Sequence, residues 1–366
     1  MQKPRVQLRC PAGNLKAVEK AIESGADAVY IGFESPSNLR NYSGLNLSIE
    51  DAKKGAALAH AAGREFYVVI NSYPQKDELE SSLRAADEAC EIGADSVIVS
   101  DISVMDYIRK RNLDLSIHLS VQVGATNAQT INFYHNEFGA DCAVLPRVLT
   151  LAEVAEVCAG TDVDIEVFAM GSLCAGYSGR CHQSQYITGE TINTRGVCTS
   201  PKFIDFEEDD AGGLTVRLNN VTINHFSPAE MTPALTACRS HSGTEVASNQ
   251  GPDGWKNTYL VNKRHVCKGS FINEATGEEG NILHTPVILN TLPILPQLIE
   301  AGVAALKIEG RQRPSSYSEI TARILREAID LYYAQPQNYQ TRDEWLAELP
   351  HLFEEMTPCE GAYIGR

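Results

Sequence analysis

The sequence lacks the short motifs that mark several large enzyme classes. It has no Gly-x-Gly-x-x-Gly loop, no Walker phosphate loop, no His-Glu-x-x-His pair and no nucleophile elbow. It therefore gives no support to a dinucleotide-dependent oxidoreductase, a P-loop nucleotide hydrolase, a zincin-type metalloprotease or an α/β-hydrolase.

Long apolar runs and basic residues are also scarce. No stretch of about 18 apolar residues occurs. The residues that follow Met1-Gln-Lys-Pro-Arg5 show neither the apolar segment nor the cleavage site of a signal peptide. We therefore expect a cytoplasmic protein with no transmembrane segment, in which thiols stay reduced and available to metals. Lys and Arg number 31 against 47 Asp and Glu, a net charge of −16, which argues against a broad nucleic-acid-binding surface.

Cysteine is the most informative residue that is present, with ten in the chain. Cys90, Cys142 and Cys158 lie in apolar patterns and are expected to be small core residues. Four others lie among Gly, Ser, Arg, Lys and Thr, which suit thiolates and bulky ligands: Cys174, Cys181, Cys198 and Cys267. Their spacing, Cys-x6-Cys-x16-Cys-x68-Cys, fits neither zinc ribbons nor small ferredoxins. An iron-sulfur cluster, a structural zinc ion and unliganded loop thiols therefore remain open, with disulfides less favoured.

A unit in which a helix ends at glycine and an apolar strand follows recurs four times, starting at Glu23, Glu91, Glu137 and Glu300. Glycine suits the residue after a helix, and a continuous apolar run suits a parallel strand that is covered on both faces. Further strand patterns bring the total to eight: 6–9, 66–70, 115–121 and 165–170. Eight strands alternating with helices predict a (β/α)8 TIM-like barrel, and a doubly wound open sheet is the alternative.

A long interruption precedes the eighth strand and favours the barrel, because barrels accept insertions in their βα loops. We expect barrel strands 1–7 within residues 1–170, an inserted cysteine-bearing subdomain after strand 7 at 171–280, barrel completion by strand 8 and the last helix at 281–334, and a C-terminal tail at 335–366. The insertion contains all four loop cysteines. Nothing in the sequence assigns a function to residues 205–258 or to Cys238.

Polar residues follow the predicted strands at the carboxyl end of the barrel, where barrel enzymes place their sites. On the fifth strand, alternation puts three polar side chains on one face. Arginines near two other strand ends could bind a carboxylate, although an ordinary ion pair is the simpler reading. The candidate substrate-binding residues are Asn14, His118, Ser120, Gln122, Arg147, Glu309 and Arg311. Cys10 with His118 would allow a cysteine hydrolase, a weaker hypothesis, so no catalytic residue is assigned.

The run Glu166-x-Phe168-x-x-Gly171-Ser-Leu-Cys174-x4-Gly179-x-Cys181-x-x-Ser184 resembles the signature of the collagenase-like peptidases of unassigned catalytic type. The chain departs from it at Gln183, where an aliphatic residue is usual. Longer motifs resemble the UbiU subgroup of that family, which acts in oxygen-independent ubiquinone biosynthesis. They include Cys10-Pro-Ala-Gly-Asn-Leu15, Val144-Leu-Pro-Arg-Val-Leu149 and Lys307-Ile-Glu-Gly-Arg-Gln-Arg313.

This resemblance implies a 4Fe-4S cluster carried by the four loop cysteines and a UbiV-like homologous subunit as partner in a heterodimer. It implies ring hydroxylation of a quinone precursor without dioxygen, with a prephenate-like anion as hydroxyl donor. Prephenate is a dicarboxylate, which would give Arg147 and Arg311 a role. Other members of the family imply an alternative, hydroxylation of tRNA or rRNA. The family's older name implies a peptidase, and a scaffold for the partner is the non-enzymatic alternative.

Overall fold

The computed structural model describes residues 5–41, 46–174, 176–182, 193, 204–208, 214–218, 221–226, 270–272, 279–281, 287–311, 313–353 and 357–365. The chain forms two compact units. The first comprises Met1–Arg180, Asn193–Gly196 and Val287–Arg366, and the second comprises Cys181–Ile192 and Val197–Pro286.

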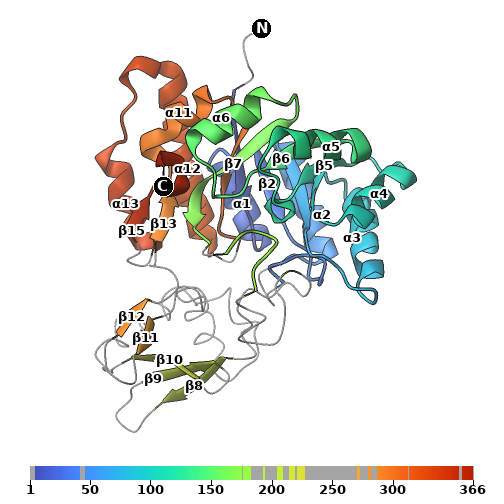
Figure 1. Cartoon of the computed structure of the whole chain (residues 1–366), viewed down its shortest axis with the longest axis horizontal. Coiled ribbons are helices and arrows are strands. Elements are labelled where there is room, and N and C mark those ends of the chain that lie inside the picture. The colour runs from blue at the N-terminus through green and yellow to red at the C-terminus, as the bar shows by residue number, and fades with distance from the viewer. Residues whose placement is uncertain are drawn as a thin grey trace. The chain divides into compact units, whose positions relative to one another are not determined.

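The first unit is a closed barrel of eight parallel strands (Figure 1). Its strands are β1 (Gln7–Pro11), β2 (Ala28–Ile31), β3 (Glu65–Ile70), β4 (Ser96–Val99), β5 (Ser116–Leu119), β6 (Ala140–Val144), β7 (Asp164–Ser172) and β14 (Ala305–Ile308). Each strand pairs with the next, and β14 closes the barrel by pairing with both β7 and β1. The predicted (β/α)8 class is confirmed, and the open sheet is excluded.

Helices alternate with the strands and cover the outside of the barrel (Figure 1). They are α1 (Leu15–Glu23), α2 (Ile49–Ala61), α3 (Leu79–Glu91), α4 (Ile102–Arg111), α5 (Ala128–Phe138), α6 (Leu151–Ala159), the short pair η4 (Leu292–Ile294) and α11 (Leu295–Glu300), and α12 (Ser315–Ala334). The glycines of the four repeats all take positive φ, from +71° to +95°. An L side chain rarely adopts this conformation, so glycine ends each helix there and turns the chain into the next strand.

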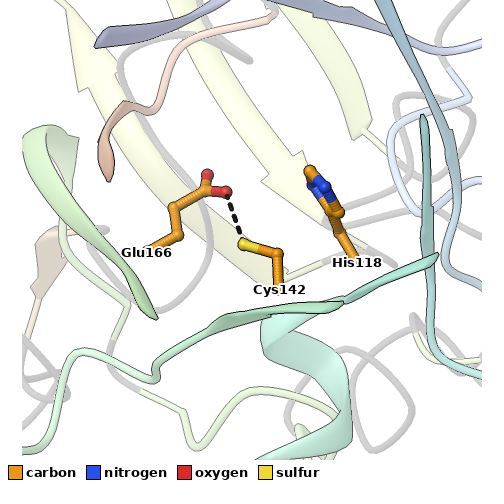
Figure 2. Close-up of side chains that lie close together, drawn as sticks. All are labelled: His118, Cys142 and Glu166. Atoms are coloured by element: carbon orange, nitrogen blue, oxygen red, sulfur yellow. Dashed lines mark hydrogen bonds between the residues drawn. The ribbon is translucent and has the colours of Figure 1, made fainter. Parts of the chain in front are cut away.

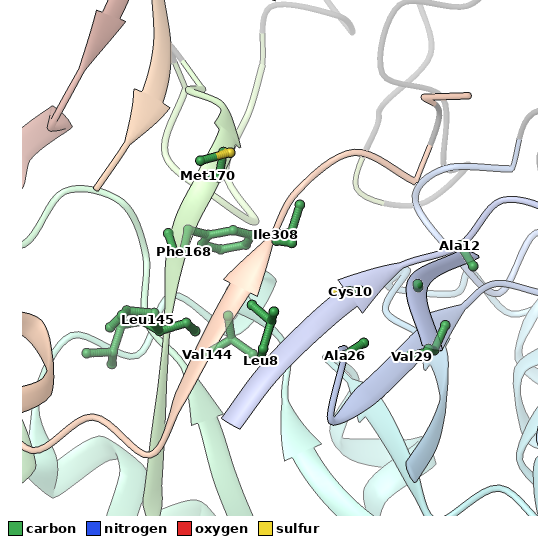
Figure 3. Close-up of a cluster of buried hydrophobic side chains, with 14 of the residues drawn as sticks. Leu8, Cys10, Ala12, Ala26, Val29, Val144, Leu145, Phe168, Met170 and Ile308 are labelled. Carbon is green, nitrogen blue, oxygen red and sulfur yellow. The ribbon is translucent and has the colours of Figure 1, made fainter. Parts of the chain in front are cut away.

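Apolar side chains of the strands and helices form a buried core layer, part of which is drawn in Figure 3. Cys10 belongs to this layer and is fully buried. Strand side chains alternate, so the neighbouring Arg9 faces the barrel interior instead. Cys10 therefore does not share the interior face with His118, as a cysteine hydrolase that uses both residues would require. Burial also raises the pKa of this thiol, which disfavours the thiolate that a cysteine hydrolase needs.

The fifth strand is shorter than predicted. It ends at Leu119, and a 3-10 turn, η1 (Val121–Val123), replaces the last part of the predicted strand. Ser120 starts this turn by accepting the amide N–H of Gln122, and Gly124 ends it at φ +69°. Gln122 therefore leaves the strand face that it was expected to share with His118 and Ser120.

Segments near the C-terminus extend the barrel sheet beside β7. Strand β13 (Val287–Asn290) pairs antiparallel with β7, and β15 (Thr357–Cys359) pairs parallel with β13. In the chain, η5 (Pro336–Asn338) and α13 (Asp343–Phe353) lie between α12 and β15, and η6 (Gly361–Ile364) follows β15. Tyr363 donates its hydroxyl hydrogen bond to the Phe168 carbonyl at 2.9 Å, which ties this end of the chain to β7.

The second unit contains a three-stranded antiparallel sheet of β8 (Ile204–Glu208), β9 (Leu214–Leu218) and β10 (Val221–Phe226), and a pair, β11 (Ser270–Ile272) and β12 (Glu279–Asn281). Cys198, Cys238 and Cys267 lie outside the described residues, as does most of 205–258. Within the described residues, no helix has the length and apolar character needed to cross a bilayer.

Candidate functional site

Charged and polar side chains from different strands meet inside the barrel. Figure 2 shows His118 on β5, Cys142 on β6 and Glu166 on β7 pointing toward one another. Arg9 from β1 reaches all three: its Nη1 donates to Glu166 and, at 3.0 Å, to the Cys142 sulfur, and lies 3.4 Å from His118 Nδ1. Lys307 from β14 donates to Glu166 at 2.6 Å. We call these five residues the buried polar layer.

Glu166 is the only carboxylate in the buried polar layer and lies between its two cations. The side chains of Arg9, Glu166 and Lys307 are 4%, 0% and 6% exposed. Burial alone would raise the pKa of Glu166, but the charges of Lys307 and Arg9 outweigh it and lower the pKa to about 2. Glu166 is therefore ionised at neutral pH and balances part of a buried positive charge.

The three residues in Figure 2 also have the chemistry of a metal site, since one ligand atom from each lies within 4.8 Å of the others. The Arg9 guanidinium, however, contacts each of the three. A metal ion at this point would have to displace Arg9 and would also face the charge of Lys307. We therefore interpret His118, Cys142 and Glu166 as the residues that surround the buried Arg9 guanidinium, and not as metal ligands.

His118 makes the fold sensitive to acid. Burial, and then the nearby Arg9 charge, lower its pKa well below the usual value, so the folded state holds His118 neutral. The unfolded chain takes up a proton below about pH 6.5, and folding stability must fall as the pH drops through that value. We expect about 1.4 kcal/mol to be lost between pH 7.5 and 5.5 through this residue.

Chemical denaturation at the two pH values tests this contribution of His118. The His118→Gln variant should lose about 1.4 kcal/mol less than the unsubstituted protein on acidification. His60, whose side chain is 43% exposed beside Asp95, provides the control substitution His60→Gln. Equal acid sensitivity in the unsubstituted protein and in His118→Gln would contradict the assignment.

Arginines surround Glu309 just beyond the end of β14, where the Glu309 side chain is 14% exposed. Burial raises the pKa of Glu309, and Arg40, Arg147, the Ser172 amide and Arg313 together lower it below its usual value. Ser172 donates its N–H to Glu309 at 2.9 Å, and Arg40 lies 3.6 Å from the other carboxylate oxygen. The carboxyl ends of β7 and β14 thus carry a predominantly cationic cluster.

Two arginines of this cluster are held in different ways. Arg311 is 5% exposed and donates to Asn38 at 2.6 Å. Gly32 leaves room for it, because a Cβ there would lie 2.5 Å from Arg311 Nη1. Arg147 is partly exposed, and its guanidinium carbon stacks 3.7 Å from the centre of the Phe168 ring. Its buried Nε has no hydrogen-bond partner within the described part of the chain, so Arg147 retains donor capacity for a ligand.

The predicted substrate-binding residues lie in different parts of the barrel. Arg147, Glu309 and Arg311 come together at its carboxyl end. Ser120 lies at the carboxyl end of β5, where its hydroxyl accepts from Asn71 at 3.2 Å, and Gln122 follows in η1. His118 lies in the buried polar layer, and Asn14 caps α1 by accepting the Ala17 N–H at 2.8 Å. The side-chain oxygen of Asn14 is therefore used in the helix cap.

The two described cysteines of the predicted metal set lie in different units. Cys174, in the barrel unit, is exposed, and Cys181, the first residue of the second unit, is partly buried. Neither forms a disulfide. Cys198 and Cys267 lie outside the described residues.

Sequence reasoning missed Arg9, Lys307 and Arg40. The sequence did contain a signal for Arg9 and Lys307, because each is the only charged residue of its strand. On a strand that is covered on its outer face, such a charge has to point into the barrel. Arg40 had no comparable signal, since it lies in the loop after β2.

Comparison with known proteins gives the family of the chain. The model of peptidase family U32 matches residues 13–365. The tRNA hydroxylation protein P of Escherichia coli is 30% identical over 335 residues, 88% of this chain and 68% of that protein. The Escherichia coli 23S rRNA 5-hydroxycytidine C2501 synthase is 32% identical over 218 residues, 58% of this chain and 31% of the synthase.

Some proteins that are similar to this chain are named for proteolysis. A collagenase of Porphyromonas gingivalis is 26% identical over 371 residues, 98% of this chain and 74% of that protein. A solved U32 peptidase structure aligns with 47% of this chain and 72% of its own, with 11% identity and a TM-score of 0.39. On the match to residues 13–365, the chain belongs to peptidase family U32.

Proposed function

We propose that this chain is the iron-sulfur subunit of an oxygen-independent hydroxylase that acts on the ring of a ubiquinone precursor together with a UbiV-like homologous subunit. One observation carries the proposal. The exposed thiol of Cys174 lies two residues beyond Ser172, whose amide is held by Glu309 within the arginine cluster. The thiol proposed as a cluster ligand and the arginines proposed to bind an anion are therefore close in the chain at the carboxyl end of β7.

Hydroxylation is the chemistry named for several relatives. The similar proteins from Escherichia coli are named for tRNA hydroxylation and for 5-hydroxycytidine synthesis. In both names the group that is modified belongs to RNA. We favour a quinone precursor for this chain because its longer motifs resemble the ubiquinone subgroup and because a net charge of −16 opposes binding to a polyanion.

The thiols fit a 4Fe-4S cluster by their chemistry. Cys174 and Cys181 form no disulfide, and exposure leaves Cys174 accessible to an incoming metal. With Cys198 and Cys267 they make the four thiolates that such a cluster requires. When bound, the cluster would supply electron transfer or Lewis acidity.

The positive charge of the arginines favours binding of an anionic hydroxyl donor such as prephenate at the carboxyl end of the barrel. The Glu309 carboxylate is influenced by the charges of Arg40, Arg147 and Arg313. Arg311 follows Glu309 by two residues in the chain. Arg311 is buried and donates to Asn38. Arg147 is partly exposed and has an unused Nε, so it is the group best placed to pair with a carboxylate.

Replacing Arg147 should weaken donor binding. We expect Arg147→Gln to raise the dissociation constant of prephenate by about tenfold or more, since a charge-assisted hydrogen bond is lost. Isothermal titration of the anaerobic complex measures this. Arg111→Gln, at a side chain that is 59% exposed on α4, is the matched control and should leave binding unchanged. Equal affinities for both variants would remove Arg147 from the site.

RNA base hydroxylation is the second candidate, supported by the names of the relatives. A peptidase is a weaker candidate, because the thiol considered as its nucleophile, Cys10, is fully buried. Anaerobic co-purification with the homologous subunit tests the lead proposal. Near four iron and four sulfide per chain, with donor-dependent hydroxylation of a quinone precursor, would support it. A colourless complex without iron would contradict it.

A further inference from the structure

The segment that follows β7 is attached to the barrel at two places, one on each side of Cys174. At the first, the Ser172 N–H donates to Glu309 at 2.9 Å. The preceding Gly171 lies against Glu309 at φ +131°, where a Cβ would collide with Glu309 backbone and side-chain atoms. This attachment fixes the point at which the chain leaves the barrel.

The second attachment is made by Gln122 in η1, at the carboxyl end of β5. The Gly179 N–H donates to Gln122 Oε1 at 2.6 Å. Gly179 has φ +77°, and a Cβ there would collide with the Gln122 carbonyl oxygen. Tyr177 adds a bond nearby, from its hydroxyl to the Gly124 carbonyl at 3.1 Å. The segment 172–180 thus runs from the end of β7 to the end of β5, past β6, which lies between them in the sheet.

Tyr73 supports Gln122 and also holds the chain where it returns to the barrel. Its hydroxyl donates to the Gln122 carbonyl at 2.7 Å, and its N–H donates to the Asn193 carbonyl at 2.7 Å. Asn193 belongs to the barrel unit and precedes Cys198 by five residues. Gly179 precedes Cys181 by two. Each of these cysteines therefore follows closely on a fixed point of the barrel.

We propose that Gln122 is a positioning residue that fixes the cysteine-bearing segment across the barrel mouth, with Glu309 as the opposite attachment. Its side-chain oxygen is already used by Gly179, and its carbonyl by Tyr73. Cys174, between the attachments, is exposed, so the segment presents a thiol from a constrained backbone. The role of this attachment in cluster assembly rests on the proposed function, whereas the attachment itself is independent of that function.

Gln122→Met tests the attachment, because methionine has a similar length but no strong acceptor. In the metal-free full chain we expect hydrogen exchange of the Gly179 amide to accelerate about tenfold, the effect of losing one hydrogen bond. Gln122→Glu keeps an acceptor oxygen and should restore slow exchange. If Gln122→Met exchanges like the unsubstituted protein, the proposal is wrong.

Iron content after anaerobic reconstitution provides the second readout. Gly179→Ala should reduce iron per chain at least severalfold, because its Cβ collides with Gln122. Gly139→Ala is the matched control: it has φ +71°, but its Cβ would meet nothing within 4 Å. Normal iron in Gly179→Ala would overturn the positioning role. Absence of iron from every variant, with fast exchange only in Gln122→Met, would instead reject the cluster and retain the attachment.

Discussion

Replacing Glu166 with glutamine is expected to lower the free energy of unfolding by about 3–5 kcal/mol. Glu166 accepts hydrogen bonds from both Arg9 and Lys307, and all three side chains are buried. Glutamine has nearly the same shape but no charge, so two cations would remain in the barrel without a counterion. Urea denaturation at pH 7.5 measures the loss, which is large compared with the total stability of most domains.

Two further variants isolate the charge effect of Glu166. Lys307→Met leaves the Arg9–Glu166 pair intact and should cost less than Glu166→Gln. Glu50→Gln removes a carboxylate whose side chain is 80% exposed in a pair with Lys54, and should change stability by less than about 1 kcal/mol. If Glu166→Gln were no more destabilising than Glu50→Gln, Glu166 would not be needed as the counterion of Arg9 and Lys307.

The second large effect is expected for Cys174→Ala, which should abolish ring hydroxylation and remove most of the bound iron. A cluster with three protein thiolates in place of four loses a ligand that alanine cannot supply. Because Cys174 is exposed and forms no disulfide, the substitution should leave the thermal stability of the metal-free chain nearly unchanged. Iron and sulfide analysis, an absorption spectrum and the anaerobic hydroxylation assay measure these effects together.

The control for Cys174→Ala is Cys90→Ala on α3, a cysteine of the barrel unit outside the proposed ligand set. It should retain iron and activity. Full iron and activity in Cys174→Ala would exclude this residue as a ligand, whereas equal losses in both variants would indicate a general effect on folding.

The barrel could be predicted from local signals because its repeats are local. Glycines at the ends of four helices and apolar strands after them specify β/α units, and these units close in few ways. The end of β5 could not be predicted. Alternation continued through Ser120 to Gln122, but the Ser120 side chain accepts the Gln122 N–H and starts a 3-10 turn. Such side-chain-to-backbone competition is invisible to a hydrophobic pattern.

The site was only partly predictable for a related reason. Strand ends indicate which residues reach the mouth, so Arg147, Glu309 and Arg311 could be named from the sequence. The partners of a side chain depend on long-range packing, as when Arg9 meets Glu166 across 157 positions of the chain. Gln122 shows the consequence: it lies at the carboxyl end of β5, as its place in the sequence indicates, but the bond from the Gly179 N–H to its side-chain oxygen could not be read from the sequence.

The most direct test of the proposed function compares two products in cells grown without oxygen. In a strain that lacks this chain, ubiquinone and hydroxylated tRNA and rRNA nucleosides are quantified by mass spectrometry, with complementation by the unsubstituted and Cys174→Ala forms. We predict that ubiquinone is lost, RNA hydroxylation is retained, and only the unsubstituted chain restores the quinone. Normal ubiquinone together with loss of a hydroxylated nucleoside would contradict the account and establish RNA as the substrate.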